Sequence, residues 1–272
     1  MIRSSITISL IPEARGGPFV FWDDLDSACA HAAKLGFHAV EIFAPSAAVL
    51  EKRQAVKTVA KHGLQLAAAG TGGGWLLKKW TLTHPDPVIR RKARRFVRDM
   101  IDWAAQLGAP AIVGSMQGRE PERENALKRL ADELGGLSAH AASLGVPLIY
   151  EPLNRYETNM INRLGDGVDF LATNRLDKVK LLPDLFHMNI EEQSIPDALV
   201  KAGSWIGHLH LVDSNRRAMG FGHTKLPPVV KALEKIGYKG FVSAEALPWP
   251  DSLGAAQQAM RAYQEFFVSK RG

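Results

Sequence analysis

Cysteine is almost absent from this chain. The one thiol, Cys29, excludes an intrachain disulfide and any zinc site built from several thiolates. A reducing compartment fits this usage, so we expect a cytoplasmic protein. No segment approaches 18 consecutive apolar residues, so we expect no transmembrane helix and no membrane partner. Residues 1–5 lead straight into a strand pattern instead of the long apolar run of a secretory leader.

The chain also lacks the glycine fingerprint of nucleotide-binding α/β folds. No G-x-G-x-x-G follows the first predicted strand, and the run from Gly70 to Gly74 has neither that spacing nor a Lys-Ser/Thr pair. We interpret this run as a mobile loop. Its sequence weighs against an open nucleotide-binding sheet.

A large charge imbalance is missing as well. Lys and Arg number 34 against 28 Asp and Glu, which gives a net charge of +6. The densest basic run, residues 90–95, fits the solvated face of one helix, so we expect no nucleic-acid partner.

Short β-rich runs alternate with amphipathic stretches along the whole chain, a pattern typical of βα units and a parallel sheet. The predicted strands are 6–11, 39–43, 64–69, 111–114, 147–153, 179–184, 206–212 and 240–246, and helical patterns include 24–35, 88–107, 120–144 and 226–236. Glycine follows several of these helices, where a left-handed cap requires it. Eight units with no linker between them predict a single (β/α)8 TIM barrel domain spanning residues 1–272.

Four of the later predicted strands end on a possible metal ligand. These residues, Glu151, Asp184, His210 and Glu245, are spaced by 33, 26 and 35 residues, each about one βα unit. The carboxyl ends of barrel strands converge at one mouth, where such folds place their active sites. Any one of the carboxylates could merely cap the next helix. The three carboxylates and the histidine together predict a divalent-metal site. Three carboxylates and one imidazole suit Mn²⁺, Mg²⁺ or Co²⁺ better than a structural zinc.

Polar residues surround these ligands where a core would be apolar. Glu157 lies six residues beyond Glu151 and could face the mouth, while His187 and Arg216 follow two other ligands, so we expect them to contact substrate. His208 precedes His210 by two residues and points to the same side of its strand. We expect it to support His210 and not to bind the metal itself.

The stretches EPLNRYE (151–157), DLFHMNIEE (184–192) and HLHL (208–211), with the Asn-Arg pair at 215–216, carry a resemblance. They resemble the D-tagatose/D-psicose 3-epimerase branch of the xylose-isomerase-like barrels, and EPLNRY with Met160 to Asn162 resembles the related epimerases of 3-keto-glycosides. The resemblance is at the level of motifs only from about residue 149 to 245. In the first half, Ile11, Glu41, Trp75 and Ser115 occupy plausible rim positions.

The resemblance implies a metal-dependent sugar epimerase or isomerase acting on a keto sugar or 3-keto-glycoside. It implies that Glu151 and Glu245 bind the metal, which we expect to be Mn²⁺, and also move protons on opposite faces of the substrate. It implies substrate contacts for Glu157, His187 and Arg216, and suggests a homodimer or homotetramer. The residues agree with this chemistry, because a metal that chelates a ketone and a neighbouring hydroxyl acidifies the carbon between them through an enediolate.

Other readings of the same residues stay open. Shifting one hydrogen between carbons would need one base and give aldose-ketose isomerisation, and loss of a leaving group or of CO₂ would make a lyase or decarboxylase. An apurinic-endonuclease-like nuclease shares the barrel, but the second and third predicted strands lack the histidines that its zinc cluster requires. A non-catalytic sugar-binding barrel would not need both carboxylates.

Overall fold

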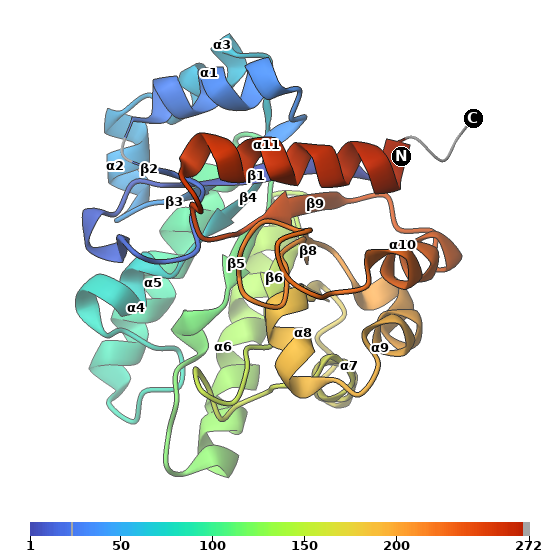
Figure 1. Ribbon diagram of the computed structural model, residues 1–272. Coiled ribbons are helices and arrows are strands. Elements are labelled where there is room, and N and C mark those ends of the chain that lie inside the picture. The colour runs from blue at the N-terminus through green and yellow to red at the C-terminus, as the bar shows by residue number, and fades with distance from the viewer. Residues whose placement is uncertain (23, 269–272) are drawn as a thin grey trace.

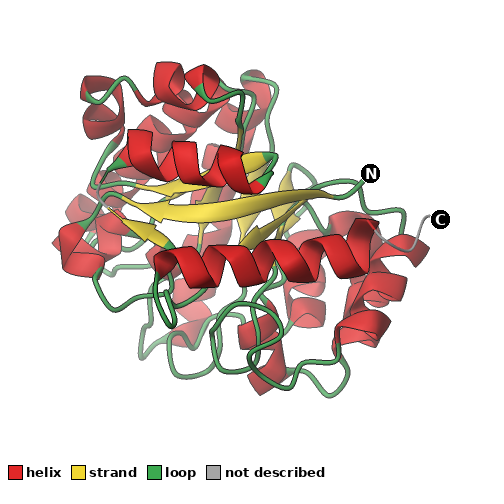
Figure 2. Cartoon of the chain, turned by 45° about the horizontal axis from the view of Figure 1, so that its top comes forward, coloured by secondary structure: helices red, strands yellow, loops and turns green. Residues whose placement is uncertain are grey.

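The computed structural model describes residues 1–22 and 24–268 and shows a ring of parallel strands enclosed by helices (Figures 1 and 2). The strands are β1 (Arg3–Ser9), β2 (Phe21–Trp22), β3 (Ala39–Phe43), β4 (Gln65–Gly70), β5 (Ala111–Val113), β6 (Leu148–Tyr150), β7 (Val179–Leu181), β8 (Leu209–His210) and β9 (Phe241–Ala244). Hydrogen bonding runs in the order β7-β6-β5-β4-β3-β1-β9-β8, and β2 pairs with β1 outside this path. Parallel bridges between Leu181 and Ile206 and between Asp184 and His210 join the two ends of the path. The predicted (β/α)8 barrel is therefore confirmed.

Helices follow the strands around the ring. They are α1 (Leu25–Leu35), α2 (Ala47–Lys52), α3 (Ala55–Lys61), α4 (Gly73–Lys78), α5 (Pro87–Ala105), α6 (Arg123–Ser143), α7 (Leu164–Thr173), α8 (Leu185–Glu191), α9 (Ile195–Ala202), α10 (Leu226–Lys235) and α11 (Ser252–Tyr263). Short turns η1 (Pro12–Ala14), η2 (Ser115–Gln117) and η3 (Gly203–Trp205) are 3₁₀-helical, and α11 runs on into a π-helical turn, η4 (Gln264–Val268). In the described part of the chain, no helix is both long enough and apolar enough to cross a membrane.

All eight predicted barrel strands are present, but most are shorter than predicted. The predicted strand 206–212 contains only β8 (Leu209–His210), and 147–153 contains only β6 (Leu148–Tyr150). The apolar runs continue past the sheet because residues beyond the strands, such as Leu153 after β6 and Val212 after β8, are themselves buried. The short strand β2 was not predicted, since two residues carry no periodic signal.

The expected glycine caps occur at the joins between helices and strands. Gly36, Gly108, Gly145 and Gly237 have φ values of 87°, 65°, 78° and 67°, which lie in the left-handed region that other residues rarely adopt. Each cap turns the chain from the helix back toward the next strand.

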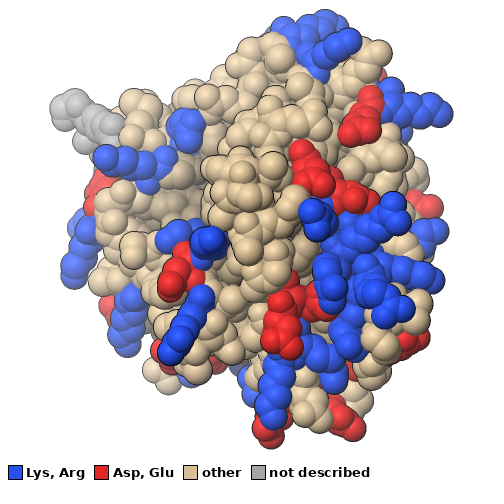
Figure 3. Space-filling view, turned by 180° about the vertical axis from the view of Figure 1, so that it is seen from behind, with Lys and Arg blue, Asp and Glu red and all other residues tan. Residues whose placement is uncertain are grey.

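The core has two parts. A large cluster fills the layer between strands and helices, and a small separate cluster of Ala68, Ile112, Ile149 and Leu182 comes from β4, β5, β6 and the end of β7. We assign the small cluster to the barrel interior, below the mouth. On the outside, Lys and Arg gather on the face seen in Figure 3, intermixed with Asp and Glu. The predicted basic run is part of α5, where Arg91, Lys92, Arg94 and Arg95 are exposed opposite a buried apolar face.

The glycine run does not form the predicted loop. Gly70 ends β4, and Gly73 and Gly74 already belong to α4. A Cβ atom at Gly70 would lie 2.3 Å from the Phe43 ring, and one at Gly74 would lie 2.7 Å from the sulfur of Met116. Neither of these two positions has room for a side chain. The prediction of a mobile loop is therefore wrong, because the run is closely packed.

Candidate functional site

The four predicted metal ligands lie together at the carboxyl ends of four strands. Glu151 follows β6, Asp184 follows β7 by three residues, His210 ends β8, and Glu245 follows β9. Nδ1 of His210 lies 3.4 Å from Glu151 Oε1, 3.2 Å from Asp184 Oδ2 and 3.4 Å from Glu245 Oε2. One ligand atom from each residue lies within 4.8 Å of all the others. Such spacing suits a single ion bound between them.

Asp184 also caps a helix, and this explains the orientation of its carboxylate. It is the N-cap of α8, where its Oδ1 accepts hydrogen bonds from the backbone N–H groups of Phe186 and His187 at 2.7 and 3.2 Å. Its other oxygen, Oδ2, faces His210. Helix capping and metal binding are thus compatible, because each uses a different oxygen of one carboxylate.

Three buried carboxylates around one imidazole leave the site short of positive charge. The exposed fractions of Glu151, Asp184, His210 and Glu245 are 7, 1, 0 and 6%. Burial alone would lower the pKa of His210, but the negative charges of Glu245 and Glu41 outweigh it and raise that pKa well above its usual range. A proton on His210 here takes the place that a cation would fill. The donor set, three hard carboxylates and one nitrogen, fits a divalent ion such as Mn²⁺ or Mg²⁺.

Glu151 and Asp184 differ in their electrostatic environment. Burial raises the pKa of Glu151 to about 7, against the opposing influence of His210. Burial acts on Asp184 in the same sense, but the electrostatic influence of His187 and the hydrogen bond from His210 outweigh it and hold that pKa below its usual range. Glu151 can therefore exchange a proton near neutral pH, while Asp184 stays ionised.

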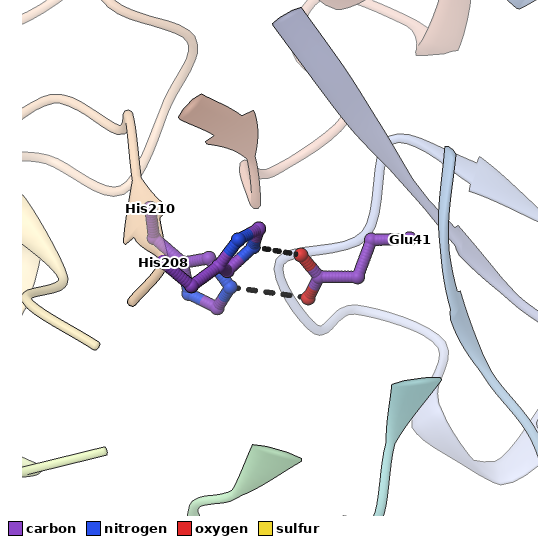
Figure 4. Close-up of side chains that lie close together, drawn as sticks. All are labelled: Glu41, His208 and His210. Carbon is purple, nitrogen blue, oxygen red and sulfur yellow. Dashed lines mark hydrogen bonds and ion pairs between the residues drawn. The ribbon is translucent and has the colours of Figure 1, made fainter. Parts of the chain in front are cut away.

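Behind His210 lies a buried carboxylate whose role the sequence did not reveal. Glu41 of β3 is fully buried, with Oε2 2.7 Å from His208 Nε2 and Oε1 3.1 Å from His210 Nε2 (Figure 4). The predicted rim position of Glu41 is therefore wrong, because its side chain points into the barrel and not toward the mouth pocket. Since an ionised carboxylate only accepts hydrogen bonds, Nε2 of His210 carries a proton and donates it to Glu41. In the neutral ring, Nδ1 is then free to bind a metal.

His208 contacts Glu41 and none of the other carboxylates of the cluster. Glu41 thus links His208 to His210, and the role of His208 as a support for His210 stays a prediction. A carboxylate inside an otherwise apolar strand, as in the sequence around Glu41, was the signal that could have predicted the arrangement.

A pocket of about 320 Å³ opens above the four ligands. The residues predicted to contact substrate, Glu157, His187 and Arg216, all line it together with Glu151 and Glu245. Arg216 Nη1 lies 3.1 Å from Glu157 Oε1, and its Nη2 lies 3.8 Å from Glu245 Oε2. The Arg216 guanidinium also lies over the Phe186 ring, 4.7 Å from its centroid.

Two buried nitrogens of pocket-lining residues lack a hydrogen-bond partner among the described residues. Nε2 of His187 and Nε of Arg216 are buried and form no hydrogen bond with any residue that the structure describes. Leaving a buried donor unpaired costs about 1–3 kcal/mol. An oxygen-rich ligand would satisfy both, which makes the pocket complementary to a polyhydroxylated molecule.

Asp213 fixes the loop that carries Arg216. Its carboxylate accepts four backbone N–H groups within 3.0 Å, those of Ser214, Gly220, Gly222 and Thr224. Burial would raise the pKa of Asp213, but these hydrogen bonds outweigh it and lower the pKa. Arg216 itself has φ 60°, a strained value for arginine, and its carbonyl accepts the N–H of Leu247 just beyond β9. The loop is therefore tied to the strand end that presents Glu245.

The first half of the barrel supplies the remaining wall of the pocket. Of the residues predicted at the rim, Ile11, Trp75 and Ser115 line it, and it also receives Phe19 and Phe43, which the sequence analysis did not single out. These aromatic residues carry no motif, and only the fold brings them to the mouth.

Glycine at the end of β5 is required for the Glu151 carboxylate to lie where it does. A Cβ atom at Gly114 would lie 2.5 Å from Glu151 Oε2. Gly114 therefore leaves the space that the carboxylate occupies.

Comparison with known proteins agrees with this architecture. The sequence profile described as "Xylose isomerase-like TIM barrel" matches residues 29–263. D-psicose 3-epimerase of Ruminiclostridium cellulolyticum is 33% identical over 223 residues, which cover 78% of this chain and 75% of the relative. A shorter match, 36% identical over 118 residues, links 43% of this chain to 45% of the 3-dehydro-D-guloside 4-epimerase of Escherichia coli.

Solved structures share the fold. A D-allulose 3-epimerase from Methylomonas sp. in complex with D-allulose superposes with a TM-score of 0.85 at 23% identity, covering 98% of this chain and 97% of that one. The apo 3-keto-D-glucoside 4-epimerase of E. coli gives a TM-score of 0.80 at 22% identity, with 97% and 99% covered. At these identities the similarity demonstrates the barrel fold alone.

Proposed function

We propose, from the premise that the chain belongs to the xylose isomerase-like TIM barrel family, that it is a metal-dependent epimerase of a keto sugar or 3-keto-glycoside. The observation that carries the proposal is the placement of Glu151 and Glu245. Both carboxylates line the pocket and both lie 3.4 Å from the same nitrogen of His210. Inverting a stereocentre requires a proton to leave on one side and return on the other, which two carboxylates can perform and one cannot.

A divalent ion held by Glu151, Asp184, His210 and Glu245 would act as a Lewis acid toward the ketone and a neighbouring hydroxyl. The three carboxylates suit Mn²⁺ or Mg²⁺ alike, and the imidazole nitrogen of His210 favours Mn²⁺, with Mg²⁺ or Co²⁺ as substitutes. Titration of metal-free protein with each ion, followed by calorimetry and turnover, tests this choice.

The chain's own side chains then perform the proton transfers. In either direction, one of Glu151 and Glu245 removes the proton beside the ketone and the other returns a proton to the opposite face. The resulting enediolate places negative charge on oxygen, which the guanidinium of Arg216 and the imidazole of His187 can stabilise. Glu157 is available to accept a hydrogen bond from a substrate hydroxyl.

Proton NMR in D₂O with candidate ketohexoses and 3-keto-glycosides tests the reaction. Solvent deuterium at an epimerised carbon supports the proposal, whereas aldose formation or elimination products without any epimer would replace it with isomerase or lyase activity. Replacing Glu245 by Gln removes one of the two bases, so we expect epimerisation to fall about 10²- to 10⁴-fold. The matched control is Glu133→Gln, a buried carboxylate paired with Arg94 outside the barrel, which should retain turnover. Equal turnover in wild type and Glu245→Gln would refute the assignment of two bases.

We further propose a homodimer or homotetramer in the cytoplasm. Tyr156, on the rim loop after β6, is 77% exposed, and Trp249 is 43% exposed, so both offer apolar surface to a second copy. Light scattering coupled to size-exclusion chromatography measures the assembly. A monomeric mass at micromolar concentration would refute it.

A further inference from the structure

We propose that Asn154 is a positioning residue that selects the tautomer of His187, so that His187 presents an N–H donor to the substrate. Asn154 lies three residues beyond Glu151 and is 2% exposed. Its side chain contacts His187 and Glu157, both of which line the pocket. The inference rests on the proposed function for its catalytic meaning, but the tautomer itself is a property of the free protein.

The orientation of the Asn154 side-chain amide is fixed from two sides. Its Oδ1 accepts the backbone N–H of Tyr156 at 2.9 Å, and a backbone N–H can only donate. Its Nδ2 lies 3.3 Å from Glu157 Oε1, and an ionised carboxylate can only accept. Exchanging the two amide atoms would set donor against donor and acceptor against acceptor. Nδ2 is therefore the atom that faces His187.

Nδ1 of His187 consequently receives two donors. Asn154 Nδ2 lies 2.7 Å away, and the backbone N–H of the same residue points to Nδ1 at 3.3 Å. A nitrogen that accepts hydrogen bonds carries no proton of its own. Glu157 Oε1 lies 4.0 Å from Nδ1, too far to draw a proton onto it by a hydrogen bond. The proton of the neutral ring is thus on Nε2.

The protonated Nε2 is the buried atom that lacks any partner in the described structure. His187 is 2% exposed and lines the pocket, so a substrate oxygen is the partner that satisfies this donor. A donor suits an oxygen whose negative charge grows as the enediolate forms, whereas a lone pair at the same place would repel it. By controlling which nitrogen carries the proton, Asn154 determines whether His187 stabilises or opposes that charge.

Replacing Asn154 by Asp keeps the shape of the side chain and reverses its hydrogen bond to His187, and it also replaces the donor to Glu157 Oε1 by an acceptor. The aspartate can only accept, so it draws the ring proton to Nδ1 and leaves a lone pair on Nε2 facing the pocket. We expect kcat to fall about 10²- to 10³-fold, the loss that follows removal of one oxyanion donor. KM should change less, because the donor is needed most when charge develops.

The direct test reads the proton position on His187 by NMR. Protein labelled with ¹⁵N-histidine, in the presence of diamagnetic Mg²⁺, gives long-range ¹H–¹⁵N correlations that distinguish the two tautomers, and the His187→Gln variant identifies the His187 signals. We expect Nε2–H in wild type and Nδ1–H in Asn154→Asp. Wild-type His187 protonated on Nδ1, or the same tautomer in both proteins, would overturn the proposal.

Asn162→Asp is the matched control, because Asn162 lies in the same loop but donates to the carbonyls of Leu153 and Thr158 and not to His187. It should leave the His187 tautomer unchanged. If Asn154→Asp does not fold, Asn154→Ala serves in its place, since only the longer hydrogen bond from the backbone N–H then remains at Nδ1 and a fraction of Nδ1–H should appear. Retention of pure Nε2–H in Asn154→Ala would assign the selection to the backbone and refute a role for the side chain.

The two proposals fail separately. If no candidate substrate incorporates deuterium but the NMR tautomers are as expected, the epimerase assignment falls and the role of Asn154 stands. If epimerisation occurs but the tautomer is the same in wild type and Asn154→Asp, only the role of Asn154 falls.

Discussion

The Glu41→Gln substitution gives the sharpest test of how the candidate metal centre is built. Glu41 is fully buried and accepts one hydrogen bond from each of two histidines, His208 at 2.7 Å and His210 at 3.1 Å. Glutamine keeps the shape but offers a single oxygen, so its amide nitrogen must face one of the two rings. If it faces His210, the ring proton moves to Nδ1, the nitrogen that faces the three carboxylates. If it faces His208, His210 keeps only a neutral and weaker hydrogen bond.

Both arrangements weaken metal binding. Losing the carboxylate that orients a histidine ligand typically lowers metal affinity by 10- to 100-fold. That range corresponds to about 1.4–2.7 kcal/mol of binding free energy. We expect the dissociation constant for Mn²⁺ to rise by this factor in Glu41→Gln.

Competition between metal-free protein and a chromophoric chelator measures this constant directly. Glu133→Gln is the matched control, because it also removes a buried carboxylate from its cationic partner, Arg94, but does so between α5 and α6. That variant is expected to lose stability and keep its metal affinity. A folded Glu41→Gln protein with wild-type metal affinity would show that Glu41 does not orient His210.

Three further predictions test other parts of the site. Gly114→Ala places a Cβ atom 2.5 Å from Glu151 Oε2, so the carboxylate must move and kcat/KM should fall about 10²-fold. The control is Gly136→Ala in α6, where a Cβ atom would meet nothing within 4 Å, and this variant should retain turnover. Removing the metal with a chelator should lower Tm by about 5–10 °C in calorimetry if the ion was present at 100 times its dissociation constant. An ion at that concentration stabilises the folded state by about 2.7 kcal/mol. An unchanged Tm would mean that the native fold binds no ion. Asp213 has a lowered pKa in the folded protein, so its contribution to stability is present above about pH 4 and is lost as pH falls through the lowered value. Urea unfolding at several pH values should therefore show a shallower acid limb in Asp213→Asn, and identical limbs would contradict the assignment.

The barrel and the convergence of the four candidate ligands were predictable because both follow from short-range regularities. The period of the βα unit recurs along the chain, and parallel strands place their carboxyl ends at one mouth whatever their side chains. The strand lengths were overestimated because residues beyond β6 and β8 are as buried as those within them. Burial produces an apolar sequence in either case, so hydrophobicity alone does not indicate where hydrogen bonding in the sheet stops.

The contacts that refine the site were not predictable for a different reason. Glu41 meets His208 and His210 across 167 and 169 residues, and no local pattern reports a pair so distant. Asn154 was visible within a motif, but its effect on His187 depends on which amide atom faces the ring. That choice is made by the N–H of Tyr156 and by the carboxylate of Glu157, and both are seen only in three dimensions.

The two halves of the barrel contribute different things to the pocket. The candidate ligands, the two candidate bases and the two unpaired donors all follow strands of the second half, whereas much of the facing wall is built from Ile11, Phe19, Phe43 and Trp75. An apolar wall forms few hydrogen bonds with hydroxyls, but it excludes water and so strengthens the electrostatic interactions across the pocket. Substitutions in that wall would alter the fit of the part of a substrate remote from the reacting carbon and leave the proton-transfer groups in place. Chemistry and substrate preference can therefore diverge separately.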